Sequence, residues 1–477
     1  MRNGVSARVL TLVLGVPLVA ASPNAWAGPI LPTSGHYVAG TGAIAKKGST
    51  GLTINQSSNS GIIDWSSFSI GKGNAVQFNN GAGATLNRVT GGDLSTIAGS
   101  LKATGSLYLI NPQGVIVSGS GKVVTGGTFV GSSRDESDSD FLNGRRKFSG
   151  TSKGNVSNAG TIKSANGDVT LIGNAASNSG HMSAKNGTAS VNAGNQVFLA
   201  PAGSRILVSG GTGSASNSGS LLGAQAQINA AGGSVYALAG NNGGIVRAIG
   251  TKTIDGHVWL TSGTGNVTIA GKVTATDADG SGGAVIARAN NIAISGKLDT
   301  SATKKTKLGG AVSIVAAGTT ELSGSIAAKG GKQGKGGSVE TSGQHLKVAD
   351  NAKVTTLSKD GLAGDWLIDP NDFTIAASGG DITGAALSSN LGTTNVTISS
   401  NDGAHAGNGD IFVNDAVSWS SAHSLTLDAY RNIDVNANVT VAGSGGLFLN
   451  TGLGGSGGAQ FRSRHRSCCV HERLEWK

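Results

Sequence analysis

A short motif of asparagine, a small residue and glycine returns at regular intervals in the middle of the chain. NAGTI at residues 158–162 recurs as NSGHM at 178–182 and as NSGSL at 217–221. The two steps are 20 and 39 residues, and we interpret the second as close to two repeat units. Repeats of this length predict a solenoid of stacked coils. The asparagines that open these repeats are expected to stack as a ladder, each amide bonding the next.

The later part of the chain contains repeats of similar length with a different residue pattern. IAGKV at 269–273 is followed by ISGKL at 294–298 and LSGSI at 322–326, at steps of 25 and 28 residues. Each unit holds about three short strands with corners of glycine, asparagine and serine, and no unit could bury its apolar face alone. At about 22 residues per coil, these units predict roughly 20 coils of an all-β parallel β-helix.

Composition agrees with this fold class and excludes several others. Glycine accounts for 79 of 477 residues without a Gly-X-Y period, which excludes collagen. Hydrophobic residues make up 38%, in short runs, which argues against a disordered chain. Aromatic residues are only 4%, whereas propeller blades would carry aromatic signatures in longer repeats.

The N-terminus has the pattern of a secretory signal. Arg2 and Arg8 precede an apolar run at residues 9–21, and Ala25-Trp26-Ala27 forms a small-x-small cleavage pattern. The apolar run is shorter than the about 20 residues that span a bilayer. We predict cleavage after Ala27 and an exported protein that is not integral to the membrane.

The segment 78–115 combines asparagines and glycines with short apolar runs and ends in a predicted turn. It contains LNRVTGG at residues 86–92 and closes on NPQGV at 111–115. Pro112 fixes its own φ, Gly114 accepts positive φ, and the Asn111 side chain can bond a nearby backbone amide. We predict a tight turn there between two strands.

These two motifs resemble the secretion domain of the filamentous haemagglutinin family, the large exoproteins of two-partner secretion systems. The family pairs an LNRVTGG-type run with an NPNG[IV] turn, and Gln113 is the one departure. The resemblance implies a right-handed β-helix, an N-terminal cap over about residues 28–60, and a cognate outer-membrane β-barrel transporter as partner. It also implies a secretion motif that shapes the N-terminal coils for the transporter's periplasmic domains. Its residues are Asn87, Arg88, Asn111, Pro112 and Gly114.

Three segments depart from the repeats. The run SSRDESDSDFLNGRRKF at residues 132–148 is highly charged but lacks calcium-loop spacing, so we predict a solvated excursion from the helix. The segment DWLIDPNDF at 365–373 is interpreted as a hydrophobic plug between two β-helical stretches, with a recognition surface as the alternative. The tail FRSRHRSCCVHERLEWK at 461–477 holds both cysteines without metal-ligand spacing and suggests a frameshift.

These observations divide the chain into five parts. They are a signal peptide at 1–27, a two-partner secretion domain at 28–270, β-helical repeats at 271–364, further incomplete repeats at 365–460, and the aberrant tail at 461–477.

No enzyme chemistry is expected, and neither is a metal or a cofactor. The eight histidines are scattered, and the glycine-rich runs lack the spacing of a phosphate loop. The net charge is +10, but the lysines are dispersed among glycines without interleaved aromatics, so nucleic-acid binding is not expected.

The function that we predict is that of a surface adhesin or haemagglutinin exported by a transporter of the two-partner type. The chain would be secreted or retained at the cell surface after crossing the periplasm of a Gram-negative bacterium, and a host-cell glycan or protein could be its target. The alternatives are an exoprotein that binds a haem carrier, and the stalk of a contact-dependent toxin truncated before its toxin domain.

Overall fold

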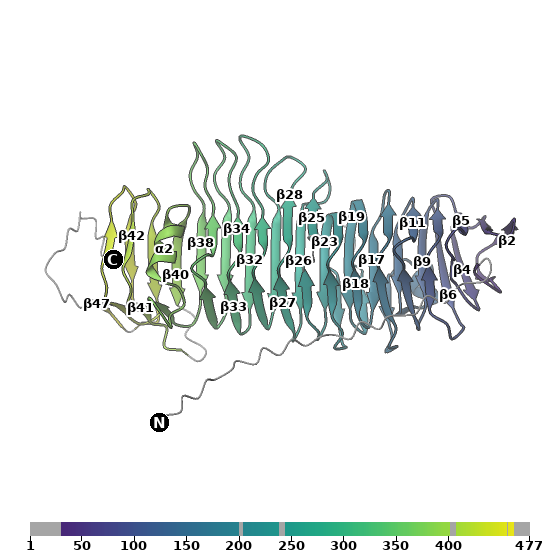
Figure 1. Ribbon diagram of the computed structural model, residues 1–477, viewed down its shortest axis with the longest axis horizontal. Helices are drawn as coiled ribbons and strands as arrows, with labels where there is room; N and C mark the ends of the chain where they lie inside the picture. The colour runs from purple at the N-terminus through teal and green to yellow at the C-terminus, as the bar shows by residue number, and fades with distance from the viewer. Residues whose placement is uncertain (1–29, 200–203, 238–243, 401–406, 456, 462–477) are drawn as a thin grey trace, which may run out of the picture.

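The computed structural model describes residues 30–199, 204–237, 244–400, 407–455 and 457–461, which form an elongated rod of stacked strands (Figure 1). The predicted signal peptide and nearly all of the predicted aberrant tail lie outside the described residues. Strands of successive coils pair in parallel and in register along the rod. The predicted all-β parallel β-helix is therefore confirmed.

Most coils contribute one strand to each of three faces, and the chain visits face 1, face 2 and face 3 in that order. Face 1 consists of β7 (Ser95–Ile97), β10 (Gly114–Val117), β15 (Asn155–Asn158), β18 (Ala176–Asn178), β22 (Ala215–Asn217), β24 (Val235–Ala237), β27 (Asn266–Ile269), β30 (Asn291–Ile294), β33 (Thr319–Leu322) and β36 (His345–Val348), followed by a second sheet of β39 (Phe373–Ile375), β41 (Ile411–Val413), β44 (Ile433–Val435) and β47 (Ala459–Phe461).

Face 2 shares the two longest strands with face 3, because β19 and β23 bend around the corner between them. Its members are β3 (Gly51–Gln56), β5 (Ala75–Asn79), β8 (Ser100–Ala103), β11 (Lys122–Thr125), β16 (Thr161–Ser164), the first parts of β19 (His181–Ala193) and β23 (Ser220–Ala230), β25 (Ile245–Ile249), β28 (Lys272–Thr276), β31 (Lys297–Asp299), β34 (Ser325–Ala327) and β37 (Lys353–Thr355), and further on β42 (Val417–Trp419) and β45 (Val439–Val441). Helix α2 (Gly384–Leu391) replaces a strand between β37 and β42, and its Asn390 Oδ1 accepts a hydrogen bond of 2.7 Å from the backbone amide of Val354.

Face 3 forms the longest stack of parallel strands. It consists of β4 (Ser60–Trp65), β6 (Ala84–Val89), β9 (Ser106–Ile110), β12 (Phe129–Ser132), β17 (Val169–Gly173), the second parts of β19 and β23, β26 (His257–Ser262), β29 (Ala284–Ala289), β32 (Ala311–Ala316), β35 (Ser338–Ser342), β38 (Asp365–Asp369), β40 (Asn395–Ser400), β43 (Leu425–Ala429) and β46 (Leu447–Asn450). These are fifteen strands in the described chain, fewer than the roughly 20 coils expected from repeat length. At about 4.8 Å between strands, the stack is roughly 70 Å long.

The coil count falls short because insertions lengthen some coils. Asn178 pairs directly with Asn217, so the 39-residue step is one coil and not two. The additional residues of that coil include an antiparallel hairpin of β20 (Gln196–Phe198) and β21 (Leu207–Ser209) outside the helix. The asparagine ladder itself is confirmed, because the Asn158 amide donates to Asn178 and the Asn178 amide donates to Asn217, each at 2.7 Å.

The interior is filled by every second residue of each strand. In β29, Val285, Ala287 and Ala289 are buried while the residues between them are half-buried. The segment 365–373 continues this pattern, because Trp366 is fully buried within β38 and its indole N–H donates to Thr341 Oγ1 at 2.9 Å. The predicted plug is thus part of an ordinary coil, and the fully buried Trp366 presents no surface for recognition.

Antiparallel strands close the N-terminal end of the rod. Strand β1 (His36–Ala39) pairs antiparallel with β4, and β2 (Gly42–Lys47) pairs antiparallel with β3. This cap covers the backbone groups that the first coil would otherwise expose as an open sheet edge. It lies where the cap was expected.

Candidate functional site

The candidate site is built from the first coils of face 3, the turn that follows β9, and a segment outside the helix. That segment runs from β13 (Asp135–Glu136) through α1 (Asp138–Leu142) to β14 (Lys147–Ser149), and β14 pairs with β20 of the later hairpin. We call β13, α1, β14, β20 and β21 together the excursion. In sequence it is split between residues 135–149 and 196–209, and strand pairing joins the two parts.

The predicted turn at residues 111–115 forms as expected, and its asparagine is the most constrained member. Asn111 is fully buried; its side-chain amide donates to Asp93 O at 2.9 Å and to Ser95 Oγ at 3.0 Å. Its side-chain oxygen accepts the amide of Gln113 at 2.9 Å. Gly114 has a φ of +121°, which favours glycine. Asn111 therefore ties the turn to the preceding corner on face 1.

The exposed part of this turn is formed by Pro112 and Gln113. The departure at Gln113 from the expected asparagine therefore lies on the surface, while the backbone bonds of the turn are kept. The Gly114 amide still donates to Asn111 O at 2.9 Å.

Asn87 lies on β6 and is buried in the interior of the β-helix. It pairs in register with Ile63 and Leu109, both of which belong to the interior core. Its side-chain oxygen accepts the indole N–H of Trp65 at 3.0 Å, and its amide donates to the backbone oxygen of Tyr108 at 3.2 Å. An asparagine amide placed here satisfies a tryptophan and a backbone carbonyl that no apolar residue could satisfy.

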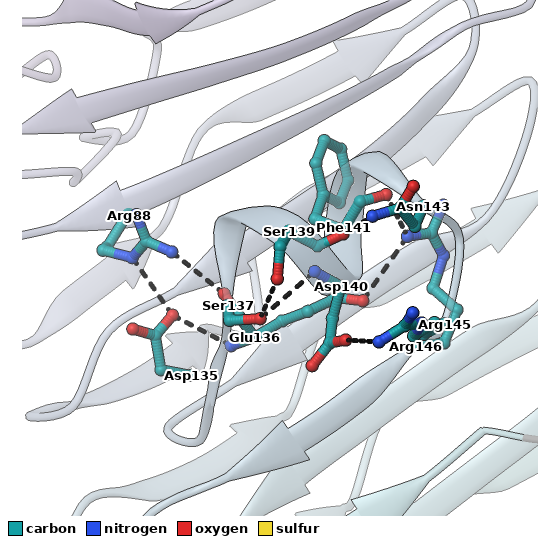
Figure 2. Close-up of polar contacts among 10 residues, drawn as sticks. All are labelled: Arg88, Asp135, Glu136, Ser137, Ser139, Asp140, Phe141, Asn143, Arg145 and Arg146. Carbon is teal, nitrogen blue, oxygen red and sulfur yellow. Dashed lines mark hydrogen bonds and ion pairs between the residues drawn. The ribbon is translucent and has the colours of Figure 1, made fainter.

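Arg88 points the opposite way, toward the excursion, because successive residues of a strand alternate in direction. Its guanidinium forms ion pairs with Asp135 at 3.1 Å and Asp138 at 2.8 Å, and with Asp64 at 3.6 Å. It also donates to the backbone oxygen of Glu136 at 2.9 Å (Figure 2). The acidic partners raise the pKa of Arg88 although burial opposes them. Arg88 thus clamps the start of the excursion onto the helix.

The excursion covers a second hydrophobic cluster on the outside of face 3. Tyr108 on β9 contacts Phe141 of α1 edge-on, with ring centroids 5.3 Å apart, and stacks on Phe148 of β14 at 6.5 Å. The cluster comprises Ile62, Leu86, Tyr108, Ile110, Val130, Phe141, Phe148, Ile172, Val197 and Ile206. The predicted excursion from the helix is confirmed, and most of its residues, including Asp135, Asp138 and Arg145, are exposed. The expectation that it is solvated throughout was wrong, because its apolar side packs on the rod.

A buried glutamate and a half-buried arginine lie under the same cover. Glu136 is fully buried and its Oε1 lies 3.4 Å from Arg146 Nη1, while its Oε2 has no hydrogen-bond partner among the described residues. The Arg146 guanidinium lies over the Tyr108 ring at 4.8 Å from its centroid. Burial raises the pKa of Glu136 to about 7 and the pKa of Tyr108 to about 12, although Arg146 opposes both shifts.

The structure therefore brings the five predicted motif residues into one region but gives them different tasks. Asn87 hydrogen-bonds Trp65 in the interior of the β-helix, and Arg88 anchors the excursion. Asn111 and Gly114 form the corner turn, and Pro112 lies on its surface. Sequence reasoning missed the excursion residues that Arg88 and Tyr108 contact. The uninterrupted apolar run SLYLI in β9 was the available signal, since a strand with one solvated face alternates.

Neither a metal centre nor a membrane-spanning helix is found in the described part of the chain. No group of three or more His, Cys, Asp or Glu there is placed to hold a metal ion. Within the same residues, no helix has the length and apolar character needed to cross a bilayer.

Comparison with known proteins identifies the region that contains this site. The family model described as the TPS secretion domain matches residues 30–274, about half of the chain. A heme/hemopexin-binding protein of Haemophilus influenzae strain Rd is 33% identical over 194 residues, which cover 39% of this chain and 20% of that protein. A second Haemophilus influenzae heme/hemopexin-binding protein is 40% identical over 112 residues, or 23% of this chain and 12% of that protein.

A solved structure has the same fold. The crystal structure of the HMW1 secretion domain from Haemophilus influenzae aligns with a TM-score of 0.55 at 20% identity, covering 88% of this chain and all of that one. The aligned segments of the two curated relatives are a fifth or less of their length, so those proteins are much longer than the region they share with this chain.

Proposed function

We propose a function from one premise, that this chain belongs to the family of two-partner secretion exoproteins that carry a TPS secretion domain. Exoproteins of this family are secreted by Gram-negative bacteria. Residues 30–274 would act as the export signal that a cognate outer-membrane transporter recognises, after the predicted signal peptide has directed the chain to the periplasm. The observation that carries this proposal is the family match over the segment in which the cap, the turn and the excursion lie together.

The fold supplies a physical reason for export in one direction. The antiparallel cap closes one end of the rod, so each later coil can add only to the open end. Each coil that forms outside the cell buries apolar side chains and pairs its backbone with the coil before it. Folding outside would therefore oppose return of the chain through the transporter.

The test is secretion of the full chain with and without a co-expressed transporter from the neighbouring locus. We expect the protein in the medium only when the transporter is present. Asn111→Ala should reduce the secreted amount, while Gln113→Ala on the exposed part of the same turn should leave it unchanged. Release without the transporter, or retention in the periplasm in both cases, would exclude export by two-partner secretion.

Beyond export, we propose that the rod acts as an adhesin at the cell surface. A rod roughly 70 Å long that carries exposed polar side chains, such as His345 and Lys347 of β36, suits display of a binding surface away from the envelope. The purified chain should bind host cells, and a loss of that binding after removal of cell-surface glycans would identify the target class.

Binding of a haem carrier is the second candidate. It is favoured by the names of the two relatives, which are both heme/hemopexin-binding proteins. Titration of the purified chain with haemopexin tests it directly. Saturable binding would favour this function, and an absence of binding would leave adhesion as the candidate.

A further inference from the structure

A row of lysines follows the corner between face 1 and face 2 in the second half of the rod. Lys272, Lys297 and Lys353 are the first residues of β28, β31 and β37, and Ser325 takes the same position in the coil between the last two. The amides of Lys297 and Lys353 donate to the corner glycine of the preceding coil at 2.9 and 3.1 Å. Lys272, Lys297 and Lys353 therefore occupy equivalent positions in stacked coils, and we call these three residues the lysine ladder.

This arrangement places like charges beside one another. Lys272 and Lys297 are direct neighbours in a parallel pair, with their strands about 4.8 Å apart. Like charges directly opposite in a sheet destabilise it. Within the described residues, Lys272 and Lys353 form no ion pair, and Lys297 reaches Asp299 only at 4.0 Å. Lys272 and Lys353 therefore keep positive charges that no ion pair of the described residues compensates, and the Lys297–Asp299 pair is solvent-accessible.

The lysines line a shallow groove of about 510 Å³ that follows the stacked corners. Its floor is formed by glycines at the corners. A Cβ added at Gly296 would lie 2.2 Å from the backbone oxygen of Gly271, and one at Gly324 would lie 2.1 Å from that of Gly296. Only glycine therefore fits these two corner positions, and the hydroxyls of Ser295 and Ser325 line the groove beside the lysines.

We propose that this groove binds a linear anionic polysaccharide lying along the axis of the rod. The lysines span four coils, or roughly 15 Å, which suits a polymer with repeated carboxylate or sulfate groups better than a single small anion. The described residues that line the groove include no aromatic side chain on which bases could stack, so the groove does not fit a nucleic acid. This described lining also offers no large apolar side chain that could insert into a lipid surface. This inference deepens the adhesive role proposed above and rests on it.

The test measures binding of the purified full chain to heparin as a sulfated probe, to polygalacturonate as a carboxylated probe, and to neutral dextran. The triple variant Lys272→Gln/Lys297→Gln/Lys353→Gln removes the ladder. Lys304→Gln/Lys305→Gln/Lys329→Gln is the matched control, because it removes the same charge from exposed residues of loops that project from the rod (Figure 1). Circular dichroism and thermal unfolding verify that both variants fold.

We expect the ladder variant to bind the anionic glycans on the order of 100-fold more weakly, since each lysine near an anionic surface contributes roughly a fivefold factor. The control variant should change binding less than about threefold. Equal losses in both variants, equal binding of duplex DNA or anionic vesicles, or no binding of either anionic glycan would overturn the proposal. The chain can be purified from whichever compartment holds it, so a failure of export would not be mistaken for a failure of binding.

Discussion

Replacement of Asn111 by alanine gives the sharpest test of how the candidate site is held together. The change removes three hydrogen bonds, to Asp93 O, Ser95 Oγ and the Gln113 amide, in a position with no exposure to solvent. A hydrogen bond contributes about 0.5–1.5 kcal/mol net, and orphaned buried partners add to the loss. We expect the corner to lose about 2–4 kcal/mol of stability.

The loss should be local, because each coil of a solenoid contacts only its neighbours. Hydrogen exchange at the amides of Gln113 and Gly114 is therefore the appropriate assay, since it reports opening of this turn. A loss of 2–4 kcal/mol corresponds to exchange roughly 30- to 1000-fold faster. Gln113→Ala is the matched control and should change exchange little, because its exposed side chain leaves the backbone bond to Asn111 in place. Acceleration of less than threefold in Asn111→Ala, or equal acceleration in both variants, would refute the reasoning.

Three further predictions concern the excursion and the later coils. Arg88→Met should weaken docking of the excursion by about 1–2 kcal/mol, since the aspartate partners of Arg88 are half exposed and screened by solvent. Limited proteolysis should then cut within residues 135–149 while the rod stays intact. Protein that remains uncut would contradict the anchoring role of Arg88. Burial raises the pKa of Glu136 to about 7, so the unfolded chain releases this proton at a lower pH than the folded chain does. The excursion should therefore lose roughly 2–3 kcal/mol of stability as the pH rises from about 4.5 to about 7. Limited proteolysis of the excursion should become faster over this pH range, and Glu136→Gln should abolish that pH dependence; the same pH dependence in both proteins would exclude this role of Glu136. Gly310→Val should prevent stacking of its coil, because a Cβ at this position would lie 2.0 Å from the backbone oxygen of Gly283. Circular dichroism should then show a loss of strand content. Native-like stability of the variant would contradict the close approach of these two coils.

The solenoid could be predicted from sequence because its repeats are local. Corner glycines and alternating apolar residues recur within each coil, and each coil pairs with the next one along the chain. The turn at Asn111 was predictable for the same reason, since its bonds to Gln113 and Gly114 lie within three residues.

Interactions between distant segments could not be predicted in this way. Arg134 is almost fully buried, and its guanidinium donates to Gly194 O at 2.7 Å and to Ser152 O at 2.8 Å. In the sequence it is one charge in a charged run, which indicates a solvated segment. Neither acceptor is identifiable until β14 and β20 have paired.

By itself, therefore, the sequence determined the β-helix, its corners and its asparagine ladder, because the spacing of glycine, asparagine and apolar residues suffices when every contact is between neighbouring coils. Only the tertiary structure decided that the 39-residue step is one coil with an insertion, and that the excursion is a packed cover. Spacing cannot distinguish an inserted hairpin from a second coil, and the charge of a segment does not show which of its faces meets water. Both depend on pairing and burial between residues far apart in the chain.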